Sequence, residues 1–209
     1  MITLAVAGLM WRRFRTERAG LWSLLFLAGT AVAGADSAFL PWLSAFLASG
    51  MPIALVLGWQ TSGERRGLMQ LCERHPGAVN RLSTAEVLAP ACCGIVPGAL
   101  AAVASGTVPW QIWLVLPLAA VLAAASALLL EKALPKGGIV LLGLYWMWSF
   151  IRLKAAPDLS ALVFFPAYPA HVIAGRTGAP HNDGFVAVSA VLACVVLYFF
   201  FRRNRTASS

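Results

Sequence analysis

Long apolar runs alternate with short polar segments along the chain. The runs cover about residues 21–35, 38–60, 84–104, 109–130, 138–150 and 185–201. A membrane-spanning helix needs about 20 apolar residues to cross a bilayer core of about 30 Å, and the shorter runs need help from a neighbouring segment. The pattern predicts an all-α polytopic membrane protein with six transmembrane helices in one domain, residues 1–209.

Three segments lie outside these runs. Residues 1–20 place apolar positions at helical spacing before a cluster of arginines, which is typical of an interfacial helix; the alternative is a basic leader without an ordered helix. Residues 61–82 are polar, and we expect them to form a cytoplasmic segment. Residues 155–183 are rich in proline and aromatic side chains, and we expect a re-entrant or loop segment on the outer side.

The basic residues predict the orientation of the chain. With the N-terminus inside, only Arg152, Lys154 and Arg176 of the 16 Lys+Arg lie outside. Cytoplasmic loops carry an excess of Lys and Arg, so we expect both termini in the cytoplasm and the chain in the cell (inner or plasma) membrane. The net charge of +8 therefore reports topology, and we expect no nucleic-acid partner.

Composition supports a lipid environment. The chain is 60% hydrophobic and 11% charged, whereas soluble domains carry about 25% charged residues. So few charges cannot cover a surface in water, and lipid bilayer is the expected surrounding. Trp42, Trp59, Trp110 and Trp113 lie near the predicted ends of apolar runs, as interfacial anchors do.

The sequence contains no catalytic motif. GxxxxGK[ST], GxSxG, HExxH and CxxC are all absent, so we expect no catalytic, cofactor or metal site. Asp36 and Glu86 are the acidic residues nearest to lipid depth between residues 21 and 130, and both lie at the ends of apolar runs. Intramembrane charges mark ion and proton pathways, so this pattern argues against an ion-coupled carrier.

Residues 63–76 form the most informative segment. Glu64 to Arg74 can form about three helical turns that end before Pro76. We expect Leu68, Leu71 and Cys72 to share one face, with charged side chains covering much of the rest. Such a helix suits docking in a groove of a cytoplasmic partner; the alternative is a solvated helix that only stabilises the turn.

The order of these segments resembles the type-2 ABC exporter permease family. Members of that family typically show E-x-x-x-G-T-L-E-x-L-x-x-x-P after the second span. This chain has Glu64-Arg65-Arg66-Gly67-Leu68, then Leu71 and Pro76, and lacks the threonine. The segment Phe165–Pro169 and Arg176 look like the family's stretch before the last span. The run after Lys136-Gly137-Gly138 gives a lesser resemblance to the haem-exporter-type permease of cytochrome c maturation.

The resemblance implies the membrane subunit of an ABC exporter. A cytoplasmic ABC ATPase subunit would hydrolyse ATP, and a second permease copy or homologue would complete the pathway. The segment between spans two and three would then be a coupling helix that contacts the ATPase. The residues expected at this contact are Glu64, Arg65, Arg66, Gly67, Leu68, Leu71 and Pro76. Alternative functions are a non-transporting membrane assembly or scaffold protein and, less favoured, a secondary carrier.

Overall fold

The described part of the chain is helical. The computed structural model describes residues 2–16, 39–60, 62–75, 77–106, 110–134 and 137–155, with the isolated positions 18, 25, 29, 191, 195 and 197–199. Within them lie α1 (Ile2–Thr16), α3 (Phe39–Gln60), α4 (Gly63–Glu73), α5 (Ala78–Ala104), α6 (Ile112–Ala133) and α7 (Gly138–Ala155). The all-α prediction is confirmed for these ranges. Nearly all of the segments 21–35, 155–183 and 185–201 lies outside them.

Three of the helices are long and apolar enough to cross a membrane. They are α3 (from Leu43), α5 and α6, and they correspond to the second, third and fourth predicted spans. The described residues therefore support three candidate spans rather than the six that the sequence predicts. The first and sixth predicted spans lie almost entirely outside these residues. α7 continues through Arg152 and Lys154, where the sequence predicts that the fifth span has closed.

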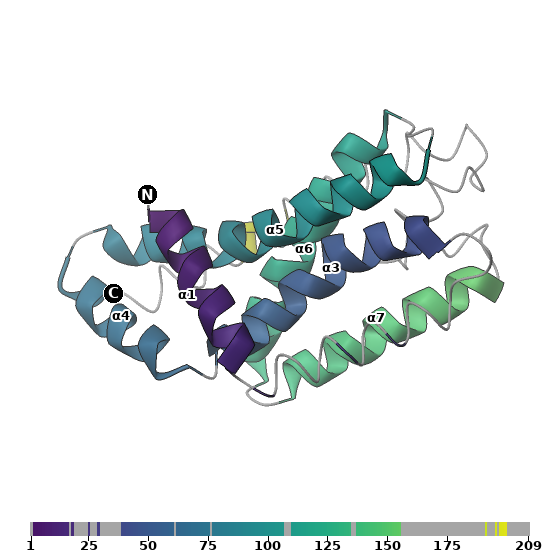
Figure 1. Cartoon of the computed structure of the whole chain (residues 1–209). Coiled ribbons are helices and arrows are strands. Elements are labelled where there is room, and N and C mark those ends of the chain that lie inside the picture. The colour runs from purple at the N-terminus through teal and green to yellow at the C-terminus, as the bar shows by residue number, and fades with distance from the viewer. Residues whose placement is uncertain are drawn as a thin grey trace.

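The bundle consists of α3, α5, α6 and α7, and each of these helices runs opposite to the one before it (Figure 1). α1 crosses over α3 and α5 near one end of this bundle, and α4 lies at the same end, which we call the α4 end. α5 begins at Ala78, six positions before the predicted start, and Leu82 in this polar stretch is buried. Pro52, Pro90, Pro97 and Pro117 lie inside helices, as membrane helices tolerate.

Small residues bring α3 and α5 close together. A Cβ atom built on Gly94 would lie 2.7 Å from the Leu47 carbonyl oxygen, and one built on Gly98 would lie 3.1 Å from that of Ser44. The Ser44 hydroxyl donates a 2.7 Å hydrogen bond to the Gly98 carbonyl. Close backbone approach through small residues is a common way to pair helices in lipid. It fixes the positions of the two helices that flank α4.

A buried tryptophan joins α7 to α3. Trp146 is fully buried, and its Nε1 donates to the Ser49 hydroxyl at 2.9 Å. Its ring meets Phe46 edge-on, with centroids 5.9 Å apart. Buried tryptophan needs a partner for its N–H, and Ser49 supplies one, so the core of α3, α6 and α7 is apolar and satisfied at this point.

Candidate functional site: a polar joint at the α4 end

α4 begins at a serine cap that also closes the preceding helix. The Ser62 hydroxyl accepts a hydrogen bond from the Arg65 backbone N–H at 3.2 Å and donates to the Trp59 carbonyl at 2.8 Å. A serine at this position satisfies backbone donors that a helix start leaves open. After α4, Gly77 takes a left-handed backbone (φ 75°) that turns the chain into α5. The short helix is thus defined at both ends by local chemistry.

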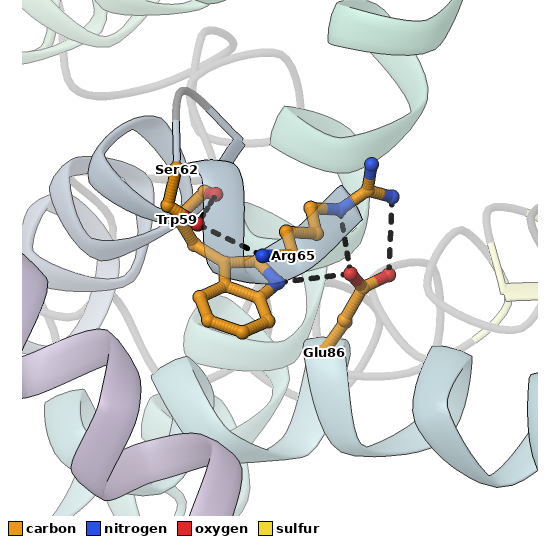
Figure 2. A network of polar contacts seen from close by, with 4 residues as sticks. All are labelled: Trp59, Ser62, Arg65 and Glu86. Atoms are coloured by element: carbon orange, nitrogen blue, oxygen red, sulfur yellow. Dashed lines mark hydrogen bonds and ion pairs between the residues drawn. The ribbon is translucent and has the colours of Figure 1, made fainter. Parts of the chain in front are cut away.

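A buried carboxylate on α5 connects three helices (Figure 2). Glu86 is only 1% exposed. Its Oε1 accepts from Trp59 Nε1 on α3 at 2.8 Å and from Arg65 Nε on α4 at 2.7 Å, and its Oε2 lies 3.4 Å from Arg65 Nη2. We call these three residues the Glu86 joint. Buried charges need a charged partner and further hydrogen bonds, and this carboxylate has both.

The inward face of α4 continues from the joint as an apolar contact. Leu68, Met69 and Cys72 pack against a cluster formed by α1, α3 and α5. The buried members of this cluster are Val6, Met10, Trp59, Leu82, Ala85 and Ala89. Positions 65, 68, 69 and 72 follow the i, i+3, i+4, i+7 spacing of one helix face. α4 is therefore held along its length, not only at its cap.

An ion pair ties α1 to the first turn of α4. Arg13 Nη2 lies 3.1 Å from Glu64 Oε1, and both side chains are about one-third exposed. A carboxylate in the first turn of a helix also interacts favourably with the helix dipole. Exposed pairs of this kind contribute little stability. The ion pair therefore links α1 to α4 but adds little to the stability of the protein.

The predicted interface residues separate into two sets in the structure. Arg65 and Leu68 face the bundle, and Glu64 faces α1. Arg66, Gly67 and Leu71 are exposed, and Pro76 lies outside the described residues. Leu71 lies at the edge of the face that it shares with Leu68 and Cys72. The inward part of that face is centred on positions 65, 68, 69 and 72, so Leu71 is left 58% exposed.

Sequence reasoning missed the Glu86 joint. Trp59 was expected to anchor at a membrane surface, yet it is fully buried and hydrogen-bonded to Glu86. Trp110 and Trp113, in contrast, are exposed. A sequence signal for the joint does exist. Glu86 stands near the start of an apolar run, and Trp59 and Arg65 flank Ser62 between this run and the preceding one. Geometrically, the joint can transmit displacement of α4 to α3 and α5.

Among the described residues, no group of three His, Cys, Asp or Glu side chains is placed to hold a metal ion. Comparison of the chain with protein-family models, curated proteins and solved structures finds no match.

Proposed function

We propose that this chain is the membrane-spanning permease subunit of an ABC exporter, in which a separate cytoplasmic ATPase supplies the energy. The observation that carries the proposal is α4, a short helix between two apolar helices that is fixed to both by the Glu86 joint. A coupling helix must contact the ATPase on one side and transmit its motion on the other. α4 has one side for each task.

The outward side of α4 suits a protein groove. It exposes Leu71 beside polar and charged side chains, namely Arg66, Gln70, Glu73 and Arg74. Helices commonly dock through a central apolar anchor with a polar rim. Arg65 and Leu68 act on the inward side, so they position α4 rather than contact the ATPase.

In this proposal the chain crosses the membrane six times with both termini in the cytoplasm. A second permease copy or homologue pairs with it, and substrate is exported or flipped between the two. ATP binding and hydrolysis displace α4, and the joint carries this displacement into α3 and α5. The three apolar helices α3, α5 and α6 support the membrane location.

The test is association with an ATPase. The full chain is cross-linked in its native membranes, purified, and assayed for ATP hydrolysis and for a co-purifying protein with a Walker A motif. We expect the wild-type chain to retain such an ATPase and Leu71→Asp to lose it at least about tenfold, because a hot-spot anchor contributes about 2 kcal/mol or more to an interface.

Leu134→Asp is the matched control, because Leu134 is also an exposed leucine, 48% exposed, at the end of α6. It should retain the ATPase. A well-folded wild-type chain without any ATPase would contradict the proposal and favour a non-transporting scaffold. Undiminished association of Leu71→Asp would remove α4 from the interface.

A further inference from the structure

α1 has two different apolar faces. Val6, Met10 and Phe14 repeat every fourth residue and are buried against the bundle. On the adjoining side of the helix, Leu4 is 78% exposed and Trp11 is 42% exposed. One apolar face is enough to dock a helix on a bundle. The exposed apolar face of α1 must therefore contact something other than the bundle.

The position of α1 identifies that surrounding. The Phe14 Cα atom lies 3.7 Å from a Cβ atom built on Gly58, close to the end of α3, and Met10 belongs to the cluster of Trp59 and Leu82. α1 thus crosses the bundle where α3 ends and α5 begins (Figure 1). If α3 and α5 cross a bilayer, this level is the boundary between acyl chains and water.

The charges on α1 complement an anionic surface. Residues 2–16 contain three arginines and no acidic residue. Arg13 pairs with Glu64, whereas Arg12 and Arg15 are exposed on the part of the helix that carries Trp11. Guanidinium groups bind phosphate oxygens in a bidentate manner, and tryptophan favours the headgroup level of a bilayer.

We propose that the outward face of α1 binds anionic phospholipid. Leu4 and Trp11 enter the acyl boundary, and Arg12 and Arg15 bind the headgroup phosphates. The Trp11 ring stacks on the anchored Phe14 ring, with centroids 5.8 Å apart, so the aromatic contact is preformed. Lipid is the occupant because apolar, aromatic and basic groups line the face without an acidic residue, next to helices suited to a bilayer. The inference does not depend on the ABC exporter assignment.

Lipid binding to the purified full chain tests the proposal. Native mass spectrometry gives apparent dissociation constants for phosphatidylglycerol and phosphatidylcholine. We expect the wild-type chain to prefer phosphatidylglycerol. Arg12→Gln/Arg15→Gln should bind phosphatidylglycerol at least about fivefold more weakly and phosphatidylcholine with unchanged affinity, since each surface arginine attracts anionic lipid substantially. Arg12→Gln alone should show an intermediate loss, and it serves if the double variant is unstable.

Arg66→Gln/Arg74→Gln is the matched control, because it removes two exposed charges from α4 and its C-terminal cap, at the same end of the molecule. It should leave phosphatidylglycerol affinity within about twofold of wild type, because neither arginine belongs to the outward face of α1. An equal loss in the control, or no preference in the wild-type chain, would overturn the proposal. Displacement of the lipid by excess inorganic phosphate would also overturn it, because it would assign the site to free phosphate. Since no ATPase is present, the result is separate from the test of the exporter assignment.

Discussion

At the scale of single residues, the Glu86 joint shows how one carboxylate can be buried in a largely apolar helix. Glu86 is the more buried partner, while the Arg65 side chain retains 16% exposure. Removing either partner therefore has unequal consequences. Without Arg65 a buried anion keeps only the Trp59 N–H, whereas without the charge on Glu86 the arginine can still turn toward water.

We predict that Arg65→Met destabilises the protein more than Glu86→Gln does. Loss of one partner of a buried pair costs about 3–5 kcal/mol, while the neutral amide of Gln can still accept from Trp59 and should cost about 1–2 kcal/mol. Thermal unfolding of the purified chain in detergent measures both. Arg66→Met, one position along on the exposed side, is the control and should unfold with the wild type. Equal destabilisation by Arg65→Met and Arg66→Met would mean that the joint adds no stability.

At the scale of helices, α4 shows what the sequence could and could not predict. The helix itself was predicted, because the stretch from Glu64 to Arg74 can form about three helical turns before Pro76. Its inward side did not, because a charged residue, Arg65, belongs to that side together with Leu68. Local amphipathicity places arginines toward water, and only the position of Glu86 in the folded bundle reverses this for Arg65.

The contact of α3 with α5 also belongs to this scale, and it leads to a second prediction. Gly94→Ala should destabilise the bundle by about 1–3 kcal/mol, the usual cost of overpacking, because its Cβ would meet the Leu47 carbonyl oxygen and the Pro52 ring. Thermal unfolding is the measurement. Gly143→Ala in α7 is the control, since nothing lies within 4 Å of its added Cβ. Alanine is the better helix former, so this control should equal or exceed wild type in stability. A similar loss at both positions would argue against a close α3–α5 contact.

At the scale of the whole molecule, hydropathy predicted the chain's class better than its boundaries. The second, third and fourth apolar runs each correspond to a helix, because a long apolar run is a strong signal even without knowledge of its neighbours in the fold. The start of α5 and the end of α7 differ from prediction. A helix can continue into polar sequence when one side stays covered, as at the start of α5, where Leu82 is buried; α7 extends through Lys154. The length of an apolar run therefore does not give the length of the helix that contains it.

The proposed orientation gives a prediction at this scale. Gln70→Cys on α4 and Ala104→Cys at the far end of α5 are both exposed positions, introduced into a chain whose native cysteines are replaced. In intact cells a membrane-impermeant maleimide should label Ala104→Cys and not Gln70→Cys, and permeabilisation should expose the latter. Labelling of Gln70→Cys in intact cells would place α4 outside and contradict the exporter proposal.

The unequal burial within the Glu86 joint also sets a direction for inherited change. A lineage that first neutralises position 86 keeps a tolerable molecule, after which position 65 can vary freely. A lineage that first loses the cation at position 65 leaves the Glu86 carboxylate buried without a charged partner, and it is disfavoured. Descendants of this chain should therefore include arginine without glutamate far more often than glutamate without arginine.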